Sequence, residues 1–142
     1  MTRPRIYAAH PIVTYGTARE RDCLASLRGV LPDVDLCDPA GRYSTDAGWL
    51  HAWPRVLASL SGLVVFGTRD GVVGVGCLRE IADVSRAGLP IAMLDHRCRA
   101  RTYAGLALPT RASTARRAAV LVPGKPVDLR ELFELPVARG AP

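Results

Sequence analysis

The residues Leu63-Val-Val-Phe-Gly-Thr-Arg-Asp-Gly-Val-Val-Gly-Val-Gly-Cys-Leu-Arg-Glu80 lie near the middle of the chain. Their first four residues are apolar, as is typical of a strand that is buried on both faces, and a glycine-rich turn follows. A helical pattern then runs as far as Gly88. The stretch therefore predicts a strand, a turn and a helix from about residue 77 to 87, with Glu80 in the first turn of that helix.

The alternation of strand and helix continues on both sides of this stretch. It predicts further strands at 5–9, 34–37, 91–94 and 118–122, and further helices at 17–28, 46–60 and 127–135. Because helices that join apolar strands produce parallel sheets, we expect one α/β domain over residues 1–142, with a loose tail from about residue 136. The expected fold is a flavodoxin-like (Rossmann-like) three-layer sandwich with a five-stranded parallel sheet of order 2-1-3-4-5.

The composition excludes several classes of protein. Hydrophobic residues make up 49% and charged residues 23% of the 142 residues, which excludes a disordered chain. No apolar run reaches the roughly 18 residues that a membrane span needs, and the N-terminus lacks a signal-peptide core, so we expect a cytoplasmic protein with no membrane partner. The four cysteines are widely spaced without a Cys-x-x-Cys pair, which predicts free thiols rather than disulfides or a zinc site.

Positive charge is concentrated in the second half of the chain. The net charge is +6, and six arginines occur without an acidic residue between positions 97 and 117: Arg97, Arg99, Arg101, Arg111, Arg116 and Arg117. Such a cluster is typical of a solvated face, or of a surface that binds phosphate or nucleic acid. Since Tyr103 is its one aromatic neighbour, nucleic-acid binding ranks last among our hypotheses.

Two segments are expected to meet at the ligand-binding edge of the sheet. Ligands of open α/β sheets bind at the carboxyl ends of the strands near the switch point, which here brings the loop 10–17 opposite the segment 67–80. The glycines Gly71, Gly74 and Gly76 would let a ligand approach the backbone closely, although a flexible connection has the same composition.

Glu80 has both a structural and a chemical explanation. A carboxylate in the first turn of a helix is favoured by about 0.3–1 kcal/mol through the helix dipole alone. However, Tyr7 and Asp70 are expected at neighbouring strand ends, where a hydroxyl can orient a carboxylate nucleophile and an acid can protonate a leaving group. Trp49 and Trp53, on the predicted helix 46–60, are expected either to pack the helix face or to stack on a base.

Four features of the sequence resemble the nucleoside 2-deoxyribosyltransferase superfamily. Ile6-Tyr7-Ala8-Ala9-His10-Pro11 is similar to its opening strand, and Gly74-Val75-Gly76, Glu80 and Ala87-Gly88-Leu89-Pro90-Ile91 are similar to its glycine turn, catalytic glutamate and following helix end and strand. The resemblance covers residues 5–94. It implies that Glu80 attacks C1′ of a nucleoside or nucleotide and that Tyr7 orients it. Asp70 is our own candidate acid for departure of the base, although an aspartate in a turn is also typical of a turn former.

The resemblance also suggests how a substrate is held. The 5′-nucleotide N-glycosidases of this superfamily bind a phosphate with hydroxyl and arginine groups of the first loop. The candidate substrate-binding residues are His10, Thr14, Tyr15, Gly16, Thr17, Arg19, Gly74, Gly76 and Arg79. Thr17 and Glu20 also fit a helix capping box, which competes with phosphate for the same helix N-terminus.

The chain departs from the family pattern in several places. Three residues separate Gly76 from Glu80, more than in many members, and His10 stands where many members have glycine. The deoxyribosyltransferases hold the sugar with a C-terminal amide of a neighbouring subunit, whereas this chain contains no Asn and no Gln. The missing amide argues against the typical transferase.

The sequence thus predicts an N-glycosidase, a hydrolase that releases the base from a nucleoside 5′-monophosphate or nucleoside, without a cofactor or metal. Two alternatives stay open. One is a nucleoside deoxyribosyltransferase, which passes the sugar to a second base. The other is a module that binds a nucleotide without cleaving it. The resemblance further implies a homodimer.

Overall fold

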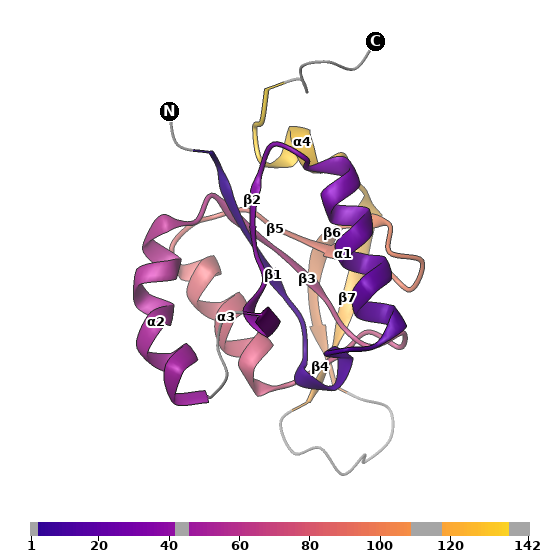
Figure 1. The fold of residues 1–142 in the computed structure, drawn as a ribbon. Helices are drawn as coiled ribbons and strands as arrows, with labels where there is room; N and C mark the ends of the chain where they lie inside the picture. Colours follow the sequence, from indigo (N-terminus) through magenta and orange to yellow (C-terminus); the bar gives the residue numbers. More distant parts are fainter. Residues whose placement is uncertain (1–2, 42–45, 109–117, 137–142) are drawn as a thin grey trace.

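The computed structural model of this chain describes residues 3–41, 46–108 and 118–136 (Figure 1). These residues form an α/β structure with one seven-stranded sheet. The strands are β1 (Arg5–Ala9), β2 (Asp35–Cys37), β3 (Gly62–Phe66), β4 (Val72–Val73), β5 (Ile91–Leu94), β6 (Ala100–Ala107) and β7 (Ala119–Pro126). The helices are α1 (Ala18–Val30), α2 (Asp46–Ser59), α3 (Val75–Arg86) and α4 (Leu129–Leu132), with single 3-10 turns η1 (Ile12–Thr14) and η2 (Pro39–Gly41).

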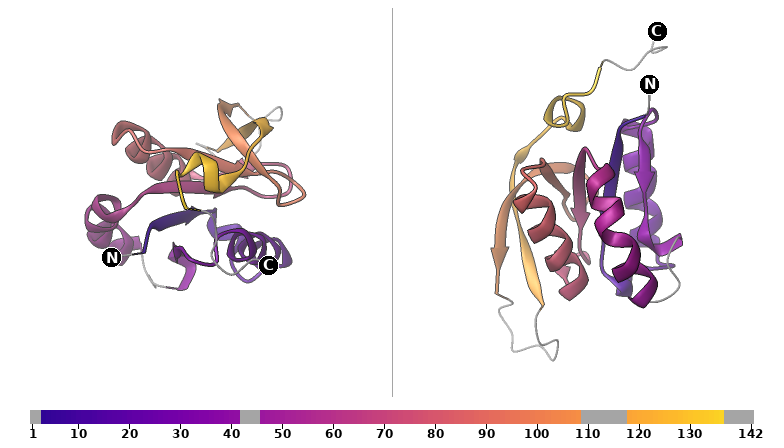
Figure 2. Two further views of the ribbon diagram at one scale, coloured as in Figure 1. Left: turned by 90° about the horizontal axis from the view of Figure 1, so that it is seen from above. Right: turned by 90° about the vertical axis from the view of Figure 1, so that its left-hand side faces the viewer.

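The first half of the sheet is parallel and is buried on both faces. β2, β1, β3 and β5 are neighbours in this order, and each pair is parallel. Successive residues of a strand point to opposite faces. Tyr7 and Val65 therefore pack beneath α2 and α3, whereas Ile6 and Phe66 pack on the other side, beneath α1 and α4 (Figures 1 and 2).

The prediction of a five-stranded parallel, flavodoxin-like sheet is wrong, because the sheet is mixed and has the order β2-β1-β3-β5-β6-β7-β4. After β5 the chain reverses in a tight turn in which the Asp95 carboxylate accepts the backbone N–H groups of Arg97 (2.8 Å) and Arg99 (3.0 Å). β6 then runs antiparallel to β5. A parallel continuation needs a crossover of about a dozen residues or more, usually a helix, and this turn leaves no room for one.

The last strands complete the antiparallel half. The predicted strand 118–122 is present as β7, but it pairs antiparallel with β6, which was not predicted (Figure 2). β4 lies inside the segment predicted as a turn, and it pairs antiparallel with the beginning of β7 at the edge of the sheet. The chain between β3 and α3 therefore leaves the middle of the sheet and rejoins it at the edge.

The helices follow the predicted pattern with changes at their ends. Thr17 is the N-cap of α1, since its side chain accepts the Glu20 N–H group, and the Glu20 carboxylate accepts the Gly16 N–H group at 3.1 Å. α3 begins at Val75 rather than near residue 77, which places Glu80 in its second turn instead of its first. α4 is shorter than the predicted helix 127–135.

Two expectations from composition concern the chain as a whole. None of the four cysteines forms a disulfide, as predicted. Across residues 3–41, 46–108 and 118–136, no helix combines the length and the apolar character needed to cross a membrane. The predicted tail lies almost wholly outside the described residues.

Candidate functional site

Glu80 lies at a cavity of about 800 Å³ near the carboxyl ends of β1 and β2. The cavity is bounded by the loop after β1, by η2, by the beginning of α2 and by the first two turns of α3. Glu80 is 4% exposed, although it lines this space. The predicted site residues His10, Tyr15, Gly74, Gly76 and Arg79 line the same cavity, together with Trp49.

A tryptophan and a tyrosine hold the Glu80 carboxylate. Trp49 Nε1 donates to Glu80 Oε2 at 3.0 Å and to the Tyr7 hydroxyl at 3.1 Å. The Tyr7 side chain is fully buried on β1, and its hydroxyl hydrogen-bonds Glu80. Trp49 stacks on Trp53, whose Nε1 donates to Asp83 at 2.8 Å. α2 and β1 thus fix the position of a carboxyl group that α3 supplies.

Burial sets the protonation states in this cavity. It raises the pKa of Glu80 to about 7, against the hydrogen bonds from Tyr7 and Trp49, which lower it. Burial and the charge of Glu80 also raise the pKa of Tyr7 far above its usual range and that of Tyr15 to about 12. Both phenols are therefore protonated near neutral pH, where Glu80 changes between its acidic and basic forms.

His10 also lines the cavity, but both of its ring nitrogens have protein partners. The Thr14 hydroxyl lies 2.8 Å from Nδ1 and also hydrogen-bonds the Pro11 carbonyl at 2.7 Å. Asp38 Oδ1 lies 2.9 Å from Nε2. Burial would raise the pKa of Asp38, but hydrogen bonds from His10 and the Ala40 amide hold it below its ordinary value. The His10 ring is thus held between the Thr14 hydroxyl and the Asp38 carboxylate.

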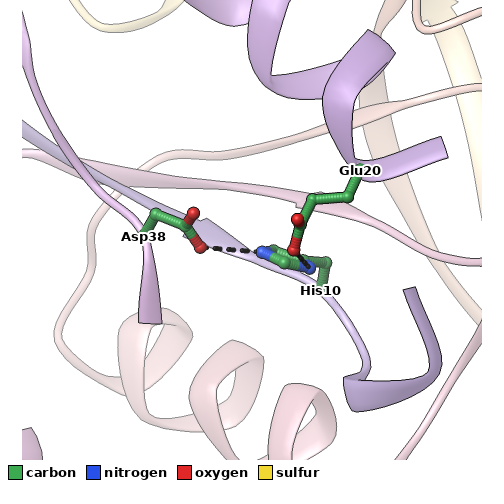
Figure 3. Close-up of side chains that lie close together, drawn as sticks. All are labelled: His10, Glu20 and Asp38. Carbon is green, nitrogen blue, oxygen red and sulfur yellow. Dashed lines mark hydrogen bonds and ion pairs between the residues drawn. The ribbon is translucent and has the colours of Figure 1, made fainter. Parts of the chain in front are cut away.

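Glu20 lies on the other side of this imidazole (Figure 3). Its Oε2 is 3.8 Å from Nδ1 of His10 and has no hydrogen-bond partner in the described part of the chain. His10, Glu20 and Asp38 offer ligand atoms within 4.8 Å of one another, as in a metal site. However, the ring turns a different nitrogen to each carboxylate, whereas metal ligands converge on one point. The arrangement fits an imidazole ring held between two carboxylates better than a chelate.

The remaining residues of the first loop serve the fold. The Arg19 guanidinium donates to the Gly67 and Asp95 carbonyls, both at 3.0 Å, and so ties α1 to the ends of β3 and β5. The hydroxyls of Thr14 and Thr17 donate to backbone carbonyls of the loop. Of the predicted phosphate-binding set 14–19, Tyr15 is the residue that lines the cavity.

Asp70 lies apart from the other predicted catalytic residues. It is exposed in the turn between β3 and β4 and does not line the cavity. By contrast, Gly74 and Gly76 do line it, and a Cβ atom at either position would meet nothing within 4 Å. The two glycines therefore leave empty space that a ligand can use.

The mouth of the cavity is apolar. Ile12 and Val13 at the mouth are 70% and 72% exposed, and Leu50 and Val75 also expose much of their side chains there. Exposed aliphatic side chains gathered around one opening suit an apolar ring of a ligand or the surface of a partner.

The role of Trp49 was not predicted from the sequence. The sequence suggested that Trp49 and Trp53 either pack the helix face or stack on a base, and in the structure the two rings stack on each other. The donation from its indole N–H to Glu80 depends on how α2 lies across the sheet, and residue spacing does not provide that information.

No protein-family model matches the chain, and no curated protein matches it. One solved structure, a conserved protein from Enterococcus faecalis V583, is similar over 65% of this chain and 63% of its own, with a TM-score of 0.49 and 18% identity. This chain thus spans less than two thirds of the length of that protein. Similarity at this level leaves the family and the function to be argued from the site.

Proposed function

We propose that this protein is an N-glycosidase that releases the base from a nucleoside or a nucleoside 5′-monophosphate, with Glu80 as the nucleophile. The observation that carries the proposal is a buried carboxyl group with a pKa of about 7, held by Tyr7 and Trp49 at a cavity of about 800 Å³. That volume is within the usual range of small-molecule sites. The resemblance of the β1 and glycine-turn motifs to the nucleoside 2-deoxyribosyltransferase superfamily supports the same function.

In the proposed reaction, ionised Glu80 attacks C1′ while the bond from C1′ to the base breaks through an oxocarbenium-like state. Water then attacks C1′ of the glycosyl-enzyme, which releases the sugar and restores the carboxylate. Trp49 and Tyr7 orient the nucleophile, and the protonated hydroxyl of Tyr15 can donate a hydrogen bond to the substrate. Asp70 has no part in this reaction, because it lies outside the cavity.

A panel of nucleosides and 5′-monophosphates, analysed by chromatography for free base, tests the proposal. Wild-type protein should release base from at least one substrate, and Glu80→Ala should abolish the release. Asp70→Ala is the matched control and should retain it, since this variant removes a carboxylate outside the cavity. Release that survives Glu80→Ala, or no release from any substrate, would overturn the proposal.

The raised pKa of Glu80 favours one alternative, a module that binds a nucleotide without cleaving it. A protonated carboxyl group cannot attack C1′, and Glu80 is protonated below about pH 7. Intact nucleotide recovered from the protein after long incubation at pH 8, where Glu80 is ionised, would favour this alternative. A deoxyribosyltransferase is distinguished by adding a second free base, which would then appear in a new nucleoside.

We further propose a homodimer in which the partner packs against exposed apolar side chains beside the mouth of the cavity and leaves the opening accessible. The exposed side chains of Ile12, Val13, Leu50 and Val75 support it. Light scattering should give twice the chain mass for wild type and the monomer mass for Val13→Glu. A wild-type monomer at all concentrations would contradict the dimer.

A further inference from the structure

Two cysteines lie side by side where α1 meets the turn between β5 and β6. The Sγ atoms of Cys23 and Cys98 lie 2.9 Å apart, although the two residues are 75 positions apart in the chain. Neither cysteine belongs to a disulfide. Since the S–S bond measures about 2.05 Å, the sulfur atoms must approach by only about 0.9 Å to form one. The pair lies on the α1 side of the sheet, away from Glu80.

The backbone at Cys98 is unusual for a residue with a side chain. Its φ angle is +58°, a conformation that glycine adopts readily and other residues rarely do. The turn holds this conformation, because the Cys98 N–H group donates to the Asp95 carbonyl at 3.0 Å and the Ser26 hydroxyl donates to the Cys98 carbonyl at 3.0 Å. Residues other than glycine that are held at such backbone angles are concentrated at functional sites.

The surroundings of the two thiols differ. Arg19 Nη1 donates to Cys98 Sγ at 3.5 Å. Cys98 is half-buried and lines a separate cavity of about 490 Å³. Cys23 is fully buried. Burial, and to a smaller extent the hydrogen bond to Cys98, raises the pKa of its thiol. An accessible thiol thus lies beside a protected one.

We propose that Cys98 and Cys23 form a dithiol site that hydrogen peroxide oxidises to an intramolecular disulfide. The Cys98 thiolate attacks one peroxide oxygen, the O–O bond breaks, and the departing hydroxide takes up a proton to become water. The sulfur of Cys23 then attacks the resulting sulfenic acid, the S–O bond breaks, and the leaving oxygen takes the Cys23 proton as a second water. The peroxide gains two electrons and the two thiols lose them. A thiol reductant reverses the modification.

The experiment uses the full-length reduced protein and one equivalent of hydrogen peroxide, followed by alkylation in denaturant, intact mass measurement and peptide mapping. We expect an intact mass that corresponds to two alkyl groups added and two hydrogen atoms lost, whereas the reduced protein gains four alkyl groups, and we expect a peptide that links Cys23 to Cys98. Cys37 and Cys77 should be alkylated, and dithiothreitol should restore four alkylated cysteines. Sulfinic or sulfonic acid at Cys98 without the linked peptide, or four thiols that remain alkylated after peroxide, would overturn the proposal.

Matched variants make the result specific. Cys98→Gly removes the thiol and fits the positive φ angle, so this variant should fold and form no cross-link. Cys23→Ser should stop the oxidation after its first step and leave a sulfenic acid at Cys98, which dimedone labels. Cys37→Ala should keep the cross-link. A Cys23→Ser protein that dimedone never labels would contradict the proposed order of attack.

Discussion

The carboxyl group of Glu80 loses its contact with water on folding. Burial raises its pKa from 4.5 to about 7, although Tyr7 and Trp49 donate hydrogen bonds that lower it. The unfolded chain therefore releases this proton at lower pH than the folded protein does. The stabilisation from the protonated group is complete below pH 4.5 and is lost as the pH rises to about 7, above which the folded protein retains a buried charge.

Glu80→Gln should separate the free-energy cost of burying the ionised carboxylate from the role of Glu80 in catalysis. Glutamine keeps the shape without the charge, so activity should be lost while the free energy of unfolding at pH 8 rises by at most about 3 kcal/mol, since each pKa unit is worth about 1.4 kcal/mol. Near pH 4 the gain should disappear. Urea titrations of both proteins at the two pH values measure the difference. An equal effect at both pH values would contradict the assigned pKa.

Trp49→Phe should change the pH dependence of activity. The variant keeps an aromatic ring beside Trp53 but removes the indole N–H that lowers the pKa of Glu80. The acidic limb of the kcat/KM profile should move to higher pH, and activity at pH 6 should fall about tenfold or more, because a hydrogen bond to a charged group is worth about 1.5–3 kcal/mol. Trp53→Phe, which loses its bond to Asp83 instead, should leave the limb in place. An unshifted limb in Trp49→Phe would count against the role of this N–H.

At the scale of residues, the sequence predicted part of the candidate site. Tyr7 and Glu80 come from motifs with a recognisable order, and they lie together. Arg19 was expected at a ligand but donates to two backbone carbonyls, because carbonyls beyond strand ends lack ladder partners and need other hydrogen-bond donors. The partnership of His10 with Asp38 joins residues 28 positions apart and depends on the register of β1 against β2.

Among the elements, α3 both packs on the sheet and lines the cavity at Glu80. Gly74 caps it without a side-chain hydrogen bond, and Gly76 lies in its first turn facing the cavity. Glycine within a helix costs about 0.5–1 kcal/mol relative to alanine. Because neither glycine has a side chain, the cavity beside Glu80 keeps open space that a larger residue would occupy.

Two substitutions at Gly76 should therefore have different effects. Gly76→Ala should raise the free energy of unfolding by about 0.5–1 kcal/mol, and Gly76→Leu should fill the cavity and raise KM at least about tenfold. Gly88→Ala is the control for a required glycine: its φ of +73° ends α3, so alanine there should destabilise the fold by about 1 kcal/mol. Denaturation curves and substrate titrations measure both quantities. A Gly76→Leu enzyme with an unchanged KM would show that ligands bind elsewhere.

The elements with strong local signals were predicted, and those without them were missed. β1, β3 and β5 are short apolar runs, and Thr17 begins α1 with a recognisable cap. β6 contains arginine, threonine and glycine, and most of its side chains are neither fully buried nor fully exposed, so it lacks the alternation that marks a strand. Its place in the sheet follows from the turn at Asp95, which only the structure reveals.

For the whole molecule, the error in the predicted fold has one physical cause. The alternation of strand and helix holds as far as β5. The prediction assumed that the strand after β5 is also parallel, although the helical crossovers end there. No helix lies between β5 and β7 in the described residues, so the remaining strands pair antiparallel. A turn of a few residues thus separates a parallel half of the sheet from an antiparallel half.

Oxidation of the cysteine pair should stabilise the whole molecule. A cross-link over 75 residues removes chain entropy from the unfolded state worth about 4 kcal/mol, which corresponds to a rise in Tm of roughly 10 °C for a domain of this size. Thermal unfolding of the reduced and the peroxide-treated protein at one pH measures the change. Cys98→Gly should show no rise after peroxide. A lower Tm in the oxidised protein would mean that strain in the bond exceeds the entropic gain.

The pairing of β4 with β7 also has a consequence for the order of folding. Val72 and Val73, which lead directly to the cavity residue Gly74, pair with Val120 and Ala119 far along the chain. Closing such a distant pair is slow compared with forming local structure. We therefore expect the segment of β4 and Gly74 to take its place beside the cavity only when β7 joins the sheet. The amide hydrogens of β4 should become protected from exchange together with those of β7. A chain that has folded only its parallel half would have the glutamate without a finished cavity around it.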